Sequence, residues 1–170
     1  MVEFDLGGAL VSGFVATVAM SSMMAMARMA GMTRMPAMPL VLGSMFTGDR
    51  QRAVQIGLLG HYLMMGTAAF GAIYALRYAA LDIDTWSAGL AIGAIHGAVV
   101  GAVVLPMMGR IHPRLRIRSG RDTVTDEGGV LLITAPGFFG RAWGAMTPMG
   151  IVVGHALYGL VSVLVYTALA

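Results

Sequence analysis

The sequence has no cysteine and no lysine among its 170 residues, and only 11% of its residues are charged. Without cysteine there can be no disulfide, thiolate metal site or thiol redox chemistry. Soluble domains have about a quarter charged residues, and a soluble fold of this size cannot bury a chain that is 58% hydrophobic. Disordered, nucleic-acid-binding and disulfide-scaffold proteins are therefore excluded, which leaves a polytopic membrane protein.

Four long stretches carry no charged residue. They contain 22, 24, 25 and 29 residues and lie between Asp5 and Arg28, Arg52 and Arg77, Asp84 and Arg110, and after Arg141. A membrane-spanning helix needs roughly 20 apolar residues, so each stretch suffices for one span. We therefore expect a single all-α transmembrane domain over residues 1–170, with spans at about 6–28, 53–77, 86–108 and 148–169. Two shorter uncharged stretches, 35–48 and 128–140, contain prolines and are expected to be interfacial or re-entrant segments.

The arginines indicate how the chain is oriented. Ten of the 11 arginines lie in or beside the connections 29–52 and 109–147: Arg28, Arg34, Arg50, Arg52, Arg110, Arg114, Arg116, Arg118, Arg121 and Arg141. Only Arg77 lies on the opposite side. Positively charged connections remain in the cytoplasm, so both connections are expected to be cytoplasmic. Both termini would then lie on the non-cytoplasmic side of a bacterial inner membrane.

The third predicted span carries a glycine at every fourth position, at Gly89, Gly93, Gly97 and Gly101. On a helix these positions form one stripe of small residues, and such stripes let helices approach closely in lipid. We expect this glycine-rich helix to be central in a transmembrane four-helix bundle.

Three histidines fall inside predicted spans. His61 and His155 lie roughly 11 Å from the cytoplasmic end of their helices and His96 about 18 Å from it. Neutral imidazole binds haem iron, copper or zinc, so these histidines, with Met65 and Tyr158, are candidates for holding a cofactor between helices. The alternative is that each histidine is neutral and hydrogen-bonds across helices.

Methionine is concentrated near the end of the first span, where Met20, Met23 and Met24 can share one helix face. Thioether sulfur suits Cu(I), which makes these residues a candidate metal site. The alternative is that methionine serves as a flexible apolar filler.

Two further expectations concern the second cytoplasmic connection. Arg114, Arg116 and Arg118 follow the third span directly, and such a cluster attracts anionic lipid or a partner subunit. His112 is expected to lie outside the membrane without a buried polar partner. Its replacement by alanine should therefore cost less stability than that of His155.

Several short segments resemble a family of small bacterial four-span membrane proteins of uncharacterised function. They are Leu42–Phe46, His96 within the glycine-rich span, His112–Arg114, Pro136–Phe139 and Gly154–Gly159. The methionine repeat and the acidic N-terminus depart from that group. The resemblance implies the fold and the membrane location, and it implies no activity.

Three functions follow as hypotheses. The first is a non-catalytic membrane subunit or scaffold, associating with other membrane subunits or with copies of itself, with or without a prosthetic group between helices. The second is a haem- or copper-binding redox or metal-handling protein. The third is a small transporter, which the absence of Asp and Glu from all four spans disfavours.

Overall fold

The computed structural model describes residues 1–118, 120 and 122–169. Arg121, one of the arginines assigned to the cytoplasmic connections, lies outside the described residues. The chain divides into two compact units. Unit 1 consists of Met1–Met24, Tyr62–Gly97 and Val152–Ala170, and unit 2 consists of Ala25–His61 and Ala98–Ile151.

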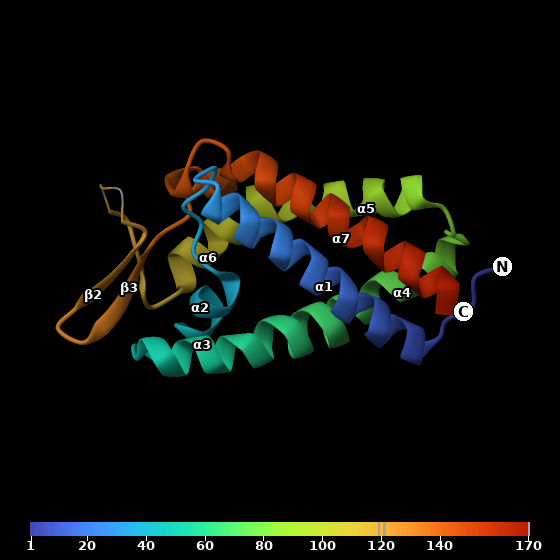
Figure 1. The fold of residues 1–170 in the computed structure, drawn as a ribbon, viewed down its shortest axis with the longest axis horizontal. Helices are drawn as coiled ribbons and strands as arrows, with labels where there is room; N and C mark the ends of the chain where they lie inside the picture. The colour runs from blue at the N-terminus through green and yellow to red at the C-terminus, as the bar shows by residue number, and fades with distance from the viewer. Residues whose placement is uncertain (119, 121, 170) are drawn as a thin grey trace. The chain divides into compact units, whose positions relative to one another are not determined.

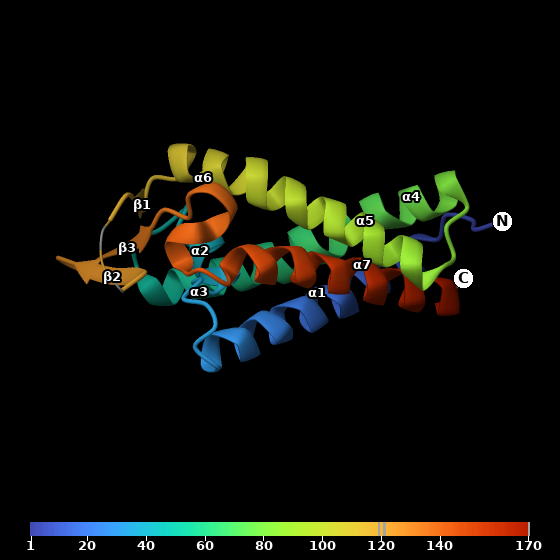
Figure 2. The same ribbon diagram turned by 90° about the horizontal axis from the view of Figure 1, so that it is seen from above.

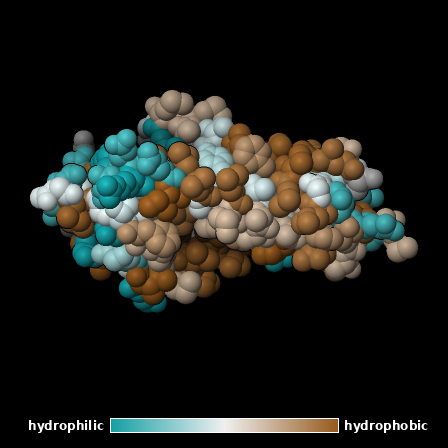
Figure 3. Space-filling view, turned by 90° about the horizontal axis from the view of Figure 1, so that it is seen from below, coloured by the Kyte–Doolittle hydropathy of each residue, from teal (hydrophilic) through white to brown (hydrophobic). Residues whose placement is uncertain are grey.

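Four helical stretches are long and apolar enough to cross a membrane, and each covers one of the uncharged runs: Leu6–Met29, Arg50–Leu81, Trp86–Ile111 and Thr147–Leu169. A helix bonds every backbone group within its own segment, which is what a lipid environment demands. The first and last stretches are single helices, α1 (Leu6–Met29) and α7 (Thr147–Leu169). In Figure 3, hydrophobic residues cover much of the helical surface, whereas hydrophilic residues gather over the strands and connections of unit 2.

The second and third stretches change helix type along their length. The second comprises α3 (Arg50–Leu58), the π-helical segment η1 (Leu59–Gly71) and α4 (Ala72–Leu81). The third comprises α5 (Trp86–Val99), the π-helical segment η2 (Val100–Val104) and α6 (Leu105–Ile111). A π-helix bonds each N–H to the carbonyl five residues earlier. In η1 the Thr67 hydroxyl donates to a carbonyl at the same spacing, that of Tyr62, at 2.6 Å. The hydropathy pattern does not predict these segments.

Unit 1 is held together by close helix contacts at glycine. A Cβ atom added at Gly13 of α1 would lie 2.7 Å from the Gly71 Cα and 2.8 Å from the Gly66 carbonyl oxygen. Helices α5 and α7 lie side by side (Figures 1 and 2), and a Cβ atom at Gly89 would lie 2.7 Å from the Gly159 carbonyl oxygen. Small residues allow this approach, which supplies the dispersion contacts that hold helices together in lipid.

The core of unit 1 combines small residues with large aromatic rings. Its buried members are Ala9, Ala16, Tyr74, Ala75, Tyr78, Tyr158, Val163 and Tyr166. The Tyr78 hydroxyl donates to the Gly159 carbonyl at 3.2 Å, and the Tyr166 hydroxyl donates to the Glu3 carbonyl at 2.7 Å. Because each hydroxyl reaches a backbone acceptor, the buried rings fill volume without leaving these polar atoms unpaired.

Unit 2 contains a three-stranded sheet that the all-α prediction missed. Strands β1 (Leu115–Arg116), β2 (Val124–Glu127) and β3 (Val130–Thr134) are arranged in the order β1-β3-β2, with β1 parallel and β2 antiparallel to β3 (Figure 2). The β2–β3 turn consists of Gly128 and Gly129, whose φ angles are +61° and +80°. Two consecutive positive φ angles suit the tight hairpin turn that matches the twist of the strands.

The connection after α1 also folds against its surroundings within unit 2. The short helix α2 (Met38–Gly43) packs on α3 so closely that Cβ atoms at Gly43 and Gly57 would collide with the backbones of Ala53 and Pro39. The buried core of unit 2 contains Leu40, Val41 and Ala53 from this pair of helices, and Leu115, Leu131 and Ile133 from the sheet.

This core changes the interpretation of residues 128–140. Leu131 and Ile133 are fully buried against other residues of unit 2, so the apolar run forms a core strand. A 3-10 segment, η3 (Phe138–Trp143), follows it. In this segment Phe139 packs against Gly101. A Cβ atom added at Gly101 would lie 2.9 Å from the Phe139 Cγ. Phe139 thus packs within unit 2, whereas Phe138 is exposed.

Candidate functional site

Two of the three intramembrane histidines lie together in unit 1. The ring centroids of His96 on α5 and His155 on α7 are 4.7 Å apart, and the rings meet edge to face at 76°. Gly93 brings them together, because it lies against the His155–Ala156 backbone, with a built Cβ only 2.9 Å from the Ala156 Cα. With the two backbones in contact, side chains near the contact meet across the helix pair.

His96 also contacts the second helical stretch. Its Nδ1 atom is hydrogen-bonded to the Tyr74 hydroxyl at 3.0 Å, and its ring centroid lies 4.7 Å from that of Phe70. Tyr74 in turn meets Tyr158 edge to face, with centroids 5.0 Å apart. A continuous group of aromatic rings, Tyr158–Tyr74–His96–His155, thus joins α4, α5 and α7 inside unit 1.

Tyr158, predicted as a cofactor-binding residue, has its hydroxyl engaged with the protein. It donates to the Gly66 carbonyl of η1 at 2.9 Å, and the side chain is buried. This bond ties α7 to η1.

The remaining two predicted cofactor residues are placed differently. His61 is buried and belongs to unit 2, whereas His96 and His155 belong to unit 1. Met65 belongs to unit 1 and is exposed. His96, His155 and Tyr158 are therefore the predicted cofactor residues that lie in the group of rings of unit 1.

The three candidate methionines converge on one point of α7. A Cβ atom at Gly154 would lie 3.3 Å from the Met23 Cε, 3.4 Å from the Met20 Cγ and 3.8 Å from the Met24 Sδ. They share a face of α1, and Gly154 directly precedes His155. Contact with a glycine is the packing expected of methionine as an apolar filler. The same contact places thioether sulfur, a soft ligand, against the residue that precedes His155.

The geometry of the histidine pair distinguishes two kinds of ligand. Metal–nitrogen bonds of about 2 Å place each ring centroid about 3 Å from a bound metal, so two imidazoles on opposite sides of one iron would be about 6 Å apart. The observed 4.7 Å does not fit a haem between His96 and His155. It fits two imidazoles on the same side of a small metal ion, about 5 Å apart in a tetrahedral site. Within the described residues, no group of three or more His, Asp or Glu could hold a metal, so thioether sulfur is a candidate for a further ligand beside the two histidines.

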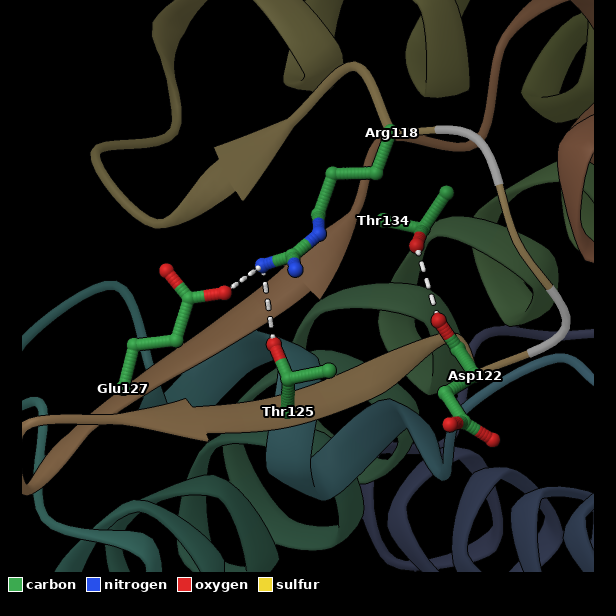
Figure 4. Close-up of polar contacts among 5 residues, drawn as sticks. All are labelled: Arg118, Asp122, Thr125, Glu127 and Thr134. Carbon is green, nitrogen blue, oxygen red and sulfur yellow. Dashed lines mark hydrogen bonds and ion pairs between the residues drawn. The ribbon is translucent and has the colours of Figure 1, made fainter.

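All three arginines of the basic cluster after the third span donate hydrogen bonds within unit 2. The Arg114 Nη1 donates to the Ser44 carbonyl at 2.6 Å, which anchors β1 to the end of α2. The Arg118 Nη1 lies 2.5 Å from the Glu127 Oε1 and donates to the Thr125 Oγ1 at 3.0 Å (Figure 4). Arg116 is exposed. Figure 4 also shows Thr134 donating to the Asp122 carbonyl beside this pair, at 3.4 Å.

The prediction that His112 lacks a buried polar partner is wrong. His112 is 4% exposed. Its Nδ1 accepts from the Arg114 backbone N–H at 3.1 Å, and its Nε2 lies 2.9 Å from the Val41 carbonyl oxygen. A neutral ring protonated at Nε2 satisfies both contacts. Burial lowers the pKa of His112 from its ordinary value of 6.5, and the charges of Arg114 and Arg116 lower it further, against the opposing hydrogen bond to Val41.

The predicted glycine stripe makes two kinds of contact. Gly89 and Gly93 face α7 within unit 1, whereas Gly101 contacts Phe139 within unit 2, and Gly97 is buried.

Sequence reasoning missed the second close helix pair, α1 with η1. Ala9, Gly13 and Thr17 of α1 lie four residues apart and meet Gly66 and Gly71. This four-residue spacing of small residues is visible in the sequence, and it could have predicted a close helix contact on this face of α1.

The fold and its buried contacts define a mostly helical membrane protein in which glycine, tyrosine and histidine join the helices. No protein-family model, curated protein or solved structure matches the chain. The resemblance to small bacterial four-span proteins stays a prediction, and the function is argued from the geometry.

Proposed function

We propose that this chain is a non-catalytic integral membrane protein that acts as a subunit or scaffold of a larger membrane complex. Its four apolar helices would cross a bacterial inner membrane as a four-helix bundle. The arginine-bearing connections would lie in the cytoplasm and both termini on the opposite side, because ten of the 11 arginines occur in or beside those connections.

The observation that carries this proposal is that polar side chains of unit 1 bond to neighbouring helices. Tyr158 donates to Gly66, Tyr78 donates to Gly159, and Tyr74 is hydrogen-bonded to His96. A polar residue inside a membrane is by default a functional candidate. Here these groups join helices, which supports a packing role over a chemical one.

The experiment is to measure the mass of the protein extracted in native lipid nanodiscs at its natural expression level. A subunit or scaffold predicts a particle with protein mass well above the 17.8 kDa of one chain, either from copies of itself or from other subunits. A single chain in every particle would contradict the proposal. A Soret absorption band in the same particles would show bound haem.

A second candidate function, handling of Cu(I), is favoured by one specific arrangement. The methionine group lies against Gly154, which directly precedes His155 of the edge-to-face pair with His96. Imidazole and thioether are ligands that copper accepts. If copper binds there, these side chains would hold it between α1, α5 and α7.

Competition with a coloured Cu(I) chelator tests this candidate in purified protein. The wild type should bind one Cu(I), His155→Phe and Met24→Leu should lose it, and Met64→Leu, at an exposed position, should retain it. A wild type that takes no Cu(I) from the chelator would contradict copper handling and leave the scaffold proposal unaffected.

A further inference from the structure

Unit 2 contains an open depression with a volume of about 560 Å³ just beyond the end of α1. Two segments distant in sequence line it, and the argument uses Arg28, Thr33, Arg34, Asp122 and Thr123. Arg28 belongs to the last turn of α1, and Asp122 and Thr123 lead into β2. The depression is separate from the histidine pair, which belongs to unit 1.

Hydrogen bonds hold the backbone that carries Arg34 in place. The Arg34 N–H donates to the Trp143 carbonyl at 2.7 Å, and the Thr123 hydroxyl donates to the Arg34 carbonyl at 2.8 Å. The Thr33 and Thr147 hydroxyls are hydrogen-bonded at 2.7 Å, in a buried position. The wall of the depression is therefore preorganised, which lowers the entropic cost of binding a ligand.

The charges of the depression favour an anion. Two arginines, Arg28 and Arg34, and one aspartate, Asp122, line the depression, so the lining carries a net charge of +1. A guanidinium group matches phosphate oxygens with two parallel N–H donors. The ligand chemistry that fits is thus a phosphate bearing one negative charge, as in a phosphodiester.

The place of the depression identifies the source of the phosphate. Arg28 lies in the last turn of a helix that is long and apolar enough to span a membrane, where lipid headgroups lie. In the same part of α1, Met26 and Met29 are exposed, and they offer an apolar surface to an acyl chain. Free phosphate has no acyl chain, so it would gain nothing from contact with an apolar surface.

We propose that this depression binds the phosphodiester headgroup of an anionic phospholipid through Arg28 and Arg34. The inference does not depend on the scaffold role. It assigns the lipid contact to the end of α1, whereas the sequence pattern suggested Arg114, Arg116 and Arg118, each of which bonds within unit 2.

The test counts phospholipid molecules bound to the purified full chain by native mass spectrometry after addition of phosphatidylglycerol or phosphatidylcholine. We expect one tightly bound phosphatidylglycerol, and we expect Arg28→Gln/Arg34→Gln to weaken its binding roughly 30-fold, from the contribution of two arginines near a lipid surface. The matched control is Arg50→Gln/Arg52→Gln, which removes the same charge from exposed positions outside the depression and should change binding less than threefold.

Three results would overturn the proposal: equal weakening in both double variants, equal binding of phosphatidylcholine, or displacement of the lipid by millimolar inorganic phosphate, which would make free phosphate the ligand. If the double variant fails to fold, Arg34→Gln alone is measured, since its side chain is exposed. Unchanged phosphatidylglycerol binding in that single variant would likewise overturn the assignment.

Discussion

Replacing Gly93 by alanine tests the contact that builds the core of unit 1. The added methyl group would lie 2.9 Å from the Ala156 Cα and well inside van der Waals contact with the His155 carbonyl oxygen. Carbon atoms pack best at about 3.5–4.0 Å, so α5 and α7 would have to separate by about 1 Å. Overpacking of this kind costs about 1–3 kcal/mol, and the backbone on the receiving side cannot rotate away as a side chain would.

The measurement is unfolding in mixed micelles of increasing SDS content, followed by circular dichroism. Gly60→Ala is the matched control, because nothing lies within 4 Å of a Cβ atom built there. Both variants replace a helical glycine by alanine and gain helix propensity, so the helix contact is the main difference between them. Gly93→Ala should be less stable than Gly60→Ala by about 1–3 kcal/mol. Equal stability of the two variants would refute the close approach of α5 and α7.

Three further predictions concern individual hydrogen bonds. Tyr158→Phe removes the bond to the Gly66 carbonyl. In the same SDS titration it should lower the free energy of unfolding by about 0.6 kcal/mol, the average for hydrogen bonds between membrane helices. An unchanged unfolding midpoint would count against that bond. Trp143→Phe removes the indole donor that lies 2.8 Å from the Thr134 carbonyl, and it should lower the free energy of unfolding by about 1–3 kcal/mol. A decrease no larger than that of Tyr158→Phe would contradict the buried bond. The pKa of folded His112 is below its ordinary 6.5, so the unfolded chain binds more protons as pH falls through about 6.5, and the stability of the protein should decline there. His112→Gln should flatten this decline between pH 7 and 5. If the stability of the wild type and of His112→Gln depended on pH in the same way, the burial of His112 would be contradicted.

The membrane-spanning stretches could be predicted because their cause is local. A run such as the 22 uncharged residues between Asp5 and Arg28 favours insertion whatever the rest of the chain does. The glycine spacing of the third span is also local, and Gly89 and Gly93 do face another helix.

The structure of unit 2 could not be predicted in this way, because it depends on residues far apart in the sequence. His112 is buried through the Val41 carbonyl, 71 residues away, and Leu115 pairs with Ile133 in a parallel ladder. Nothing near His112 in the sequence reveals either contact. The apolar run Val130–Thr134 has the same composition as an interfacial segment, and only its partner strands show that it belongs to a core.

The histidines illustrate the same limit. Depth along a helix placed His61 and His155 about 11 Å and His96 about 18 Å from the cytoplasmic end, but depth does not fix which face of a helix meets which neighbour. The contact of Gly93 with α7 sets that for His96 and His155.

The account depends most on the four membrane crossings with the arginine-bearing connections in the cytoplasm. Because the chain has no cysteine, single cysteines report accessibility without background. Arg50→Cys and Asp84→Cys, both at exposed positions, should be treated with a membrane-impermeant maleimide in spheroplasts. The account predicts that Asp84→Cys is labelled at once and Arg50→Cys only after the membrane is permeabilised. Labelling of Arg50→Cys in intact spheroplasts would contradict it.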